Sequence, residues 1–323
     1  MSTSEPLAAW DAAVKAYLTS RHAIGRLYAK EEYFLDDLRA FLVDINAVDL
    51  NRPLFDQWRG RASHLSANTR IVRDYTVYNF CRYRRRREPD CYLPDPGGLT
   101  RPGPRPLPTI VERNQVTQLL EYLSTMEPPA NAPLRPVVLR MAVLLLYTTG
   151  LRRGELVRLT LADTDPVQGT LFIRESKHHR SRWVPLSQSM CEELREYLEL
   201  RRRAGIDCRD RAPLIVTVRG DAYTLGGFYR AIKTVLLTAG ICDSNGHCPC
   251  LQDFRHSFAV GALLRWYEEG ADVQVNLPKL ALYMGHVSIV STAYYLRCMP
   301  NVLAHASQRF ENSYATLLEG DLP

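Results

Sequence analysis

The sequence of 323 residues lacks any long apolar run. The longest, Met141–Tyr147, is far shorter than the roughly 18 residues that a membrane-spanning helix needs. The N-terminus also lacks the basic and then apolar segments of a secretory signal. These absences predict a cytoplasmic protein that makes no use of a membrane.

Regularly paired cysteines are also scarce. The eight cysteines are mostly scattered, which predicts free thiols in a reducing compartment rather than disulfides. One group lies close together in the sequence: Cys242, His247, Cys248 and Cys250. A structural zinc site normally takes two ligand pairs from separate elements, so we expect a loop that carries thiols, with no metal and no cofactor. Metal binding by this group is the alternative.

Proline and glycine, by contrast, are concentrated in one segment. The twenty residues 91–110 contain six prolines and three glycines. Proline neither continues a helix nor occupies a central strand. This composition predicts a linker over residues 92–108, between a first domain of residues 1–91 and a second domain of residues 109–323 that includes a C-terminal tail.

The first domain has the periodicity of helices. Apolar residues recur at i, i+3, i+4 and i+7 in residues 33–48, and Ser66 or Asn68 is a candidate N-cap for a second, arginine-rich helix. A charged run is usually a solvated face, but the net charge of +6 and a small helical domain also suit contacts with DNA phosphates. The candidate DNA-binding residues are Arg70, Arg73, Arg82, Arg84 and Arg85.

The second domain is predicted to be mostly helical with one small sheet. The segment GTLFIRESKHHRSRWVPLS indicates a hairpin of two strands, Thr170–Glu175 and Arg182–Leu186, around a polar turn. Helices are expected at residues 109–122, 137–148, 191–203, 226–239, 254–268, 277–283 and 302–318. The predicted fold class is therefore mainly α, with a helical domain followed by a mixed α/β domain that contains a small antiparallel sheet.

Four motifs carry the polar residues of interest: TTGLRRGELVRLTLAD, SKHHRSRWVPL, LQDFRHSFAV and YMGHVSIVSTAYYL. Any one of them is weak, but all four in this order resemble the tyrosine recombinases, or phage-type integrases, over the whole second domain. The basic helical segment resembles that family's core-binding domain. The resemblance implies a site-specific DNA recombinase that cleaves and rejoins DNA strands through a 3′-phosphotyrosine intermediate.

The catalytic residues that the resemblance implies are Arg152, Lys177, Gln252, Arg255, His286 and Tyr295. Two guanidiniums suit the nonbridging phosphate oxygens, because their planar forks match them and stay charged. Tyrosine attack stores the bond energy in a phosphotyrosine, and Lys177 is a suitable acid for the leaving 5′-oxygen. The spacing of nine from His286 selects Tyr295, whereas Tyr294 is expected to pack beside the site.

One position departs from the family pattern. Gln252 stands where most members have histidine, and an amide cannot accept a proton near neutral pH. His256 is expected to face another side of its helix, and Glu155 and Asp163 are expected to be structural partners of the Arg152 helix. Two alternatives to an active recombinase stay open: a weakened or silent DNA-binding accessory protein, and a type IB topoisomerase-like relaxing enzyme.

The resemblance also implies partners. These are double-stranded DNA with inverted-repeat core sites, a homotetramer assembled on that DNA, and accessory recombination proteins as further candidates. The C-terminal tail is expected to dock on a neighbouring subunit, with packing on its own core as the alternative. The segment LLRWYEEGADVQVNLPKLALYMGHVS resembles recombinases of transposon-like elements more than Xer-type enzymes, which favours a role in DNA integration or transposition.

Overall fold

The chain divides into two units, Met1–Pro106 and Leu107–Pro323, and each is described by itself. The computed structural model describes residues 7–103, 109–174, 181–242, 246–286 and 288–298. Within these residues, no helix has both the length and the apolar character needed to span a bilayer.

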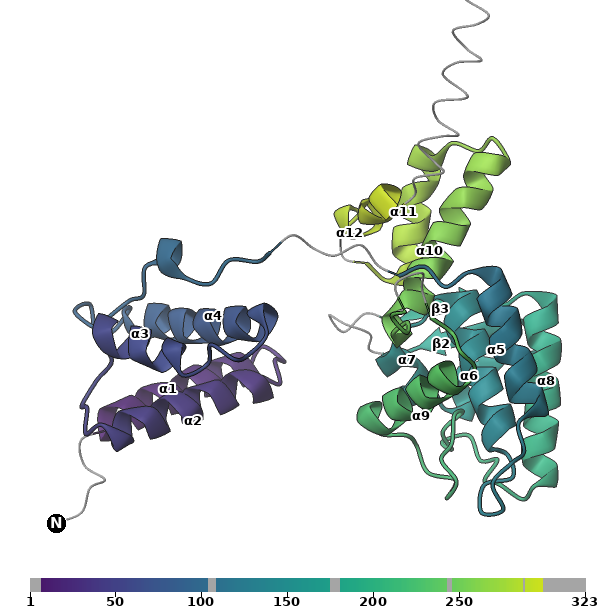
Figure 1. Ribbon diagram of the computed structural model, residues 1–323, viewed down its shortest axis with the longest axis horizontal. Coiled ribbons are helices and arrows are strands. Elements are labelled where there is room, and N and C mark those ends of the chain that lie inside the picture. The colour runs from purple at the N-terminus through teal and green to yellow at the C-terminus, as the bar shows by residue number, and fades with distance from the viewer. Residues whose placement is uncertain (1–6, 104–108, 175–180, 243–245, 287, 299–323) are drawn as a thin grey trace, which may run out of the picture. The chain divides into compact units, whose positions relative to one another are not determined.

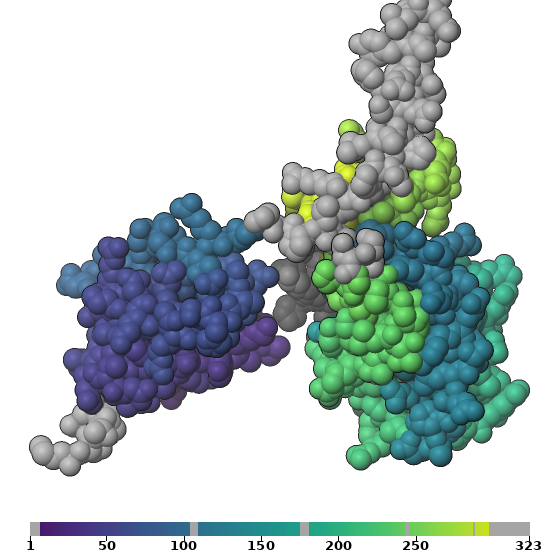
Figure 2. Space-filling view, viewed as in Figure 1, coloured from purple at the N-terminus to yellow at the C-terminus, as the bar shows by residue number. Residues whose placement is uncertain are grey.

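Four helices build the first unit. They are α1 (Ala8–His22), α2 (Ala29–Asp44), α3 (Arg52–Gly60) and α4 (Ala67–Arg84), followed by the 3-10 helix η1 (Pro96–Gly98). The predicted N-cap of α4 is confirmed at Ser66, whose hydroxyl accepts a hydrogen bond from the Thr69 amide. An aromatic core in which Trp10 packs edge-on against Phe80 holds the helices together, and the unit forms a compact body in Figure 2.

The first part of the predicted linker packs on this unit. Leu99 is buried in the aromatic core. The backbone amide and hydroxyl of Thr100 both donate to the carboxylate of Asp74, at 3.0 and 2.7 Å. Prolines limit regular structure in this segment to the short helix η1, but its apolar and hydroxyl side chains still contact the helices.

The second unit contains eight α-helices, two short 3-10 helices and three strands within the described residues. The helices are α5 (Arg113–Thr125), α6 (Arg135–Thr149), α7 (Arg153–Arg158), η2 (Leu161–Asp163), α8 (Gln188–Arg203), α9 (Leu225–Thr238), α10 (Leu251–Glu268), α11 (Val273–Met284) and α12 (Val290–Ala293), with η3 (Tyr294–Cys298) after them. The strands are β1 (Thr164–Asp165), β2 (Thr170–Ile173) and β3 (Arg182–Pro185).

Helix α6 lies at the centre of this unit. It is apolar around most of its circumference, as expected of a buried helix, and it packs against α5, α8 and α10 (Figure 1). Helix α10 then continues into a second, smaller core with α11 and η3. The two cores meet where α6 ends, and this junction positions the polar site.

The sheet is antiparallel with strand order β1-β2-β3. The predicted hairpin is confirmed, with Thr170 opposite Pro185 and Ile173 opposite Arg182. The short strand β1, which was not predicted, adds one edge by pairing Thr164 with Leu171. The hairpin turn, residues 175–180, lies outside the described residues, and so does the predicted helix over 302–318.

Candidate active site

The two predicted arginines come to one place from different elements. Arg152 is the N-cap residue of α7, just after the turn that ends α6. Arg255 lies in the first half of α10, which packs on α6, and only 1% of its surface is exposed. Both side chains reach the end of α11, so two residues that are distant in sequence become neighbours.

The C-terminal end of α11 receives three arginines. Arg182 Nε donates to the carbonyl of Tyr283 (2.7 Å), Arg255 Nη2 to that of Met284 (2.6 Å), and Arg152 Nη2 to that of Gly285 (3.0 Å). The last carbonyls of a helix have no partner within it and carry partial negative charge. The arginines therefore satisfy this helix end and are held in place by it.

Arg182 belongs to this cluster but was not predicted from the sequence. Side chains alternate across a strand, and Arg182 in β3 lies two residues before the fully buried Val184. An arginine on the inward face of a strand must find carboxylates or carbonyls there. That alternation is the sequence signal that points to it.

Two glycines with left-handed backbones border the cluster. Gly150 (φ +60°) ends α6, and its carbonyl accepts from Arg255 Nη1 at 2.6 Å. Gly285 (φ +65°) ends α11. A Cβ at Gly150 would lie 2.5 Å from the ring of Phe258, and one at Gly285 would lie 3.0 Å from Arg182 Nη1. The left-handed φ angle favours glycine at both positions, and at Gly150 the Phe258 ring also leaves no space for a Cβ.

Glu155 joins two of the arginines. Its carboxylate accepts from both terminal nitrogens of Arg182 (3.0 and 2.9 Å) and from Nη1 of Arg152 (2.7 Å). Burial by itself would raise the pKa of Glu155, but Arg182 and Arg152 lower it to about 2. Glu155 thus takes the expected structural position beside Arg152, whereas Asp163 bonds Thr160.

Positive charge exceeds negative charge in this cluster. Among the residues that the structure describes, three guanidiniums accompany the carboxylate of Glu155 here. Burial and the neighbouring charge of Arg152 lower the pKa of Arg255 to about 10, which still leaves it protonated at neutral pH. An excess of buried guanidinium charge is an environment that favours an anion such as a phosphate.

His286 lies two residues beyond Met284, the last residue of α11. Its Nδ1 is 2.7 Å from the hydroxyl of Thr292, which is fully buried. Burial, followed by the charges of Arg255, Arg152 and Arg182, lowers the pKa of His286 to about 4. The ring is therefore neutral at neutral pH in this structure.

The phenol of Tyr295 lies beside these groups. Tyr295 is 3% exposed in η3, and its ring centroid is 6.3 Å from that of His286, with the planes at 24°. Tyr294 is half-buried against the small core, and its ring centroid is 6.1 Å from that of Tyr295. The structure thus brings Arg152, Arg255 and His286 around Tyr295.

His256 faces another side of α10 than Arg255, as expected, and this side meets Tyr295. His256 Nδ1 is 3.1 Å from the phenol oxygen of Tyr295. Neighbouring helix residues point about 100° apart, and η3 packs along α10 and so meets the His256 side of that helix. Gln252, in the first turn of α10, is exposed to solvent.

Two further predictions concern Lys177 and the cysteine group before α10. Lys177 lies in residues 175–180, outside the described residues, and stays a prediction. Cys248 and Cys250 are partly buried before α10. Within the described part of the chain, His, Cys, Asp and Glu side chains form no group of three that could hold a metal ion.

The candidate DNA-binding arginines of α4 divide into two kinds. Arg73 is 5% exposed, lies 3.6 Å above the ring of Trp58 and pairs with Asp37. Arg84 is 9% exposed and bonds acidic side chains. These two guanidiniums bind carboxylates within the first unit, so we no longer consider them candidates for DNA contacts. The candidates that remain are the exposed Arg82 and Arg85 and the half-buried Arg70.

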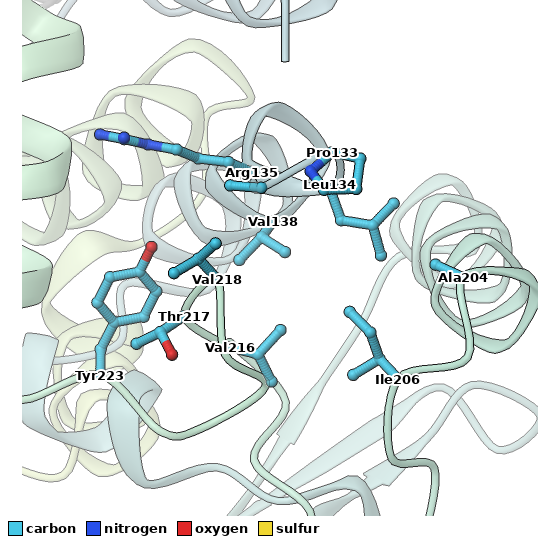
Figure 3. Close-up of a pocket in the computed structure, with 11 residues that line it drawn as sticks. Pro133, Leu134, Arg135, Val138, Ala204, Ile206, Val216, Thr217, Val218 and Tyr223 are labelled. Carbon is cyan, nitrogen blue, oxygen red and sulfur yellow. The ribbon is translucent and has the colours of Figure 1, made fainter. Parts of the chain in front are cut away.

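A pocket of about 230 Å³ lies elsewhere in the second unit (Figure 3). Its walls are mostly aliphatic, for example Val138, Ile206 and Val216, with Arg135 also lining it. Arg135 begins α6, whereas the arginine cluster lies at the other end of that helix, roughly 20 Å away at 1.5 Å per residue. The pocket is therefore separate from the cluster.

Comparison with known proteins assigns the family. The model of the phage integrase family matches residues 110–301. The Sinorhizobium fredii (strain NGR234) protein y4rB, described as an integrase/recombinase, is 32% identical over 309 residues, which cover 94% of this chain and 97% of that protein. The chain belongs to the phage integrase family of tyrosine recombinases. The predicted family and enzyme class, a tyrosine-type site-specific DNA recombinase, are confirmed.

Solved structures show the same fold for this tyrosine recombinase. The XerH site-specific recombinase bound to palindromic difH substrate has a TM-score of 0.65 at 19% identity, covering 87% of this chain and 79% of that chain. The Tn1549 transposon integrase in complex with transposon right end DNA has a TM-score of 0.63 at 15% identity, covering 88% and 94%. The predicted fold class is thereby confirmed.

Proposed function

We propose that this tyrosine recombinase cleaves and rejoins double-stranded DNA through a 3′-phosphotyrosine formed on Tyr295. The observation that carries the proposal is the convergence of Arg152, Arg255 and His286 beside that phenol, at the end of α11. A site with excess guanidinium charge around one tyrosine suits attack on a phosphodiester.

Each group has a task in this reaction. The Tyr295 oxygen bonds to phosphorus while the bond from phosphorus to the 5′-oxygen breaks. Arg152 and Arg255 stabilise the charge that builds on the nonbridging oxygens, and a neutral His286 is able to donate a hydrogen bond to one of them. Lys177 protonates the leaving 5′-oxygen. A 5′-hydroxyl from another strand then attacks the phosphotyrosine and releases the enzyme.

The proposed substrate is DNA with inverted-repeat core sites, bound by a homotetramer. The relative XerH was solved on a palindromic DNA site and the Tn1549 integrase on a transposon end, which supports both a DNA substrate and a role in integration or transposition. The exposed Arg82 and Arg85, at the end of α4, are proposed to contact the phosphates of such a site. The C-terminal tail is proposed to dock on a neighbouring subunit. Accessory recombination proteins are proposed as further partners.

A nicked suicide substrate tests the chemistry. The duplex carries inverted repeats recovered from DNA beside the gene, with the nick placed so that the cleaved fragment diffuses away. Wild-type protein is expected to form a covalent adduct, Tyr294→Phe to retain it and Tyr295→Phe to lose it.

Other outcomes favour the other functions. Site-specific binding without any adduct, unchanged by Tyr295→Phe, would identify a silent DNA-binding protein. Relaxation of supercoiled plasmid that lacks the inverted repeats would identify a topoisomerase-like enzyme. Either result overturns the proposed strand transfer.

A further inference from the structure

The proposed attack requires a place for the proton of the Tyr295 phenol. A phenol has a pKa of about 10, so its proton must leave as the bond to phosphorus forms. Gln252 cannot take that proton, and its side chain is exposed at the start of α10. Another group within hydrogen-bond reach has to act instead.

His256 is in contact with the phenol oxygen. Its Nδ1 is 3.1 Å from the Tyr295 oxygen, within the reach required of a general base. The two ring centroids are 5.4 Å apart, and the ring planes are tilted by 55°. The imidazole is half-buried, because η3 packs along this side of α10.

His286, the other histidine beside Tyr295, is less suited to accept the proton. Its Nδ1 is already 2.7 Å from the hydroxyl of Thr292. Its pKa is lowered to about 4 by burial and by the charges of Arg255, Arg152 and Arg182. Such an imidazole is a weak base, and the arginines next to it stay protonated at neutral pH.

Several described groups form the electrostatic environment of His256 and Tyr295. Arg255, on α10, interacts through space with Tyr295, and His286 with His256. Arg152 and Arg182 reach the same cluster from α7 and β3, and Tyr294 adjoins from η3. The surrounding charge is positive, so it favours the phenolate over the phenol.

We propose that His256 is the general base that accepts the phenol proton of Tyr295, the function for which Gln252 is unfit. The proposal rests on the proposed strand-transfer function. The proton moves from the Tyr295 oxygen to His256 Nδ1, which requires the neutral tautomer with its proton on Nε2. The Tyr295 oxygen forms its bond to phosphorus as the bond to the 5′-oxygen breaks. In the rejoining step, His256 returns the proton to the departing phenolate.

The test measures the rate of adduct formation on the suicide substrate as a function of pH. His256→Asn places an amide near the position of Nδ1, so it keeps a hydrogen-bond acceptor but removes the base. We expect a loss of about 10²- to 10⁴-fold in rate. The wild-type rate of adduct formation is expected to fall as the pH is lowered from about 8 to 5, the range in which histidine changes charge. The rate of His256→Asn should not show this fall. His64→Asn, at an exposed histidine of the first unit, is the matched control.

A modified substrate separates the base from the acid. When sulfur replaces the bridging 5′-oxygen, the leaving thiolate needs no proton. Lys177→Ala should then recover most of its cleavage rate, whereas His256→Asn should not. His256→Gln, with DNA binding and thermal unfolding measured alongside, provides a second variant in case the asparagine variant folds poorly.

The outcomes are distinguishable. If wild-type protein forms no adduct, the strand-transfer proposal fails, and the role of His256 fails with it. If wild-type forms the adduct but both His256 variants keep its rate and pH profile, only the role of His256 fails. If the His256 variants are slower by the same factor at every pH and their rate still falls at acidic pH, His256 only positions the phenol. That result also overturns the proposal.

Discussion

The carboxylate of Glu155 holds two arginines of the site, so its replacement by glutamine measures how firmly the site is assembled. Glutamine keeps the shape but removes the charge, which leaves Arg152 and Arg182 facing each other without compensation. The pKa of Glu155 is about 2 instead of 4.5, because the arginines overcome the opposing effect of burial. Such a shift corresponds to about 3 kcal/mol of folding stability at neutral pH.

We therefore expect Glu155→Gln to lower the free energy of unfolding by about 3 kcal/mol at pH 7. Since Glu155 is 3% exposed, solvent screening does not reduce this value much. Native-state hydrogen exchange in peptides from α7, α10 and α11 is the suitable assay, because it reports on the second unit within the full chain. A loss of 3 kcal/mol appears as a protection factor about a hundredfold lower.

The pH dependence supplies a second check. A carboxyl whose folded-state pKa is lowered stabilises the protein above its unfolded pKa, and this contribution is lost as the pH falls through the folded pKa. The difference between wild-type and Glu155→Gln should thus be constant above pH 4.5 and shrink toward pH 2. The control is Glu199→Gln: the pKa of Glu199 is also about 2, but its side chain is 40% exposed, so little change is expected. A difference below 1 kcal/mol at pH 7 for Glu155→Gln would refute the reasoning.

Three further predictions follow from the same contacts. Gly150→Ala should destabilise the second unit by about 2 to 4 kcal/mol, from a left-handed backbone and a clash with Phe258, and hydrogen exchange in α6 would measure it. The double variant Arg82→Ala/Arg85→Ala should bind DNA more weakly with unchanged stability, and the salt dependence of its affinity should indicate up to about two fewer phosphate contacts. Arg73→Ala should instead lower the free energy of unfolding by about 2 kcal/mol. The pKa of His286, followed by NMR, should lie near 4 in the free protein and rise when a phosphate binds. Because the folded-state pKa of His286 is lowered, this residue contributes stability above about pH 6.5, and the contribution is lost as the pH falls through 4. A normal titration of His286 would contradict the environment described for it. Unchanged DNA affinity of the double variant would contradict the phosphate contacts, and a fully stable Gly150→Ala protein would contradict the clash with Phe258.

Local patterns in the sequence were sufficient for most of the elements. Ser66 begins α4 as predicted, since N-capping needs only residues within one turn. The hairpin of β2 and β3 follows from alternation and a polar turn. Helix ends were less well predicted: α11 begins at Val273 instead of Leu277, because Pro278 lies inside the helix, where a proline usually marks an end.

Side-chain partners, in contrast, depended on tertiary packing. The arginine-rich pattern of α4 did not distinguish the exposed Arg82 from Arg73, which is buried against Trp58. Arg182 was missed because its partners, Glu155 and the carbonyl of Tyr283, come from elements far away in the sequence. A charged residue has the same local pattern whether it meets water or a distant carboxylate.

The sequence by itself determined the family and the mainly helical fold class with a small antiparallel sheet. These features depend on short motifs and on local periodicity. Only the tertiary structure decided that His256 touches Tyr295 and that three arginines converge on the end of α11. Such contacts join segments that are far apart along the chain, and the packing of α10 against α6, α11 and η3 sets which faces meet.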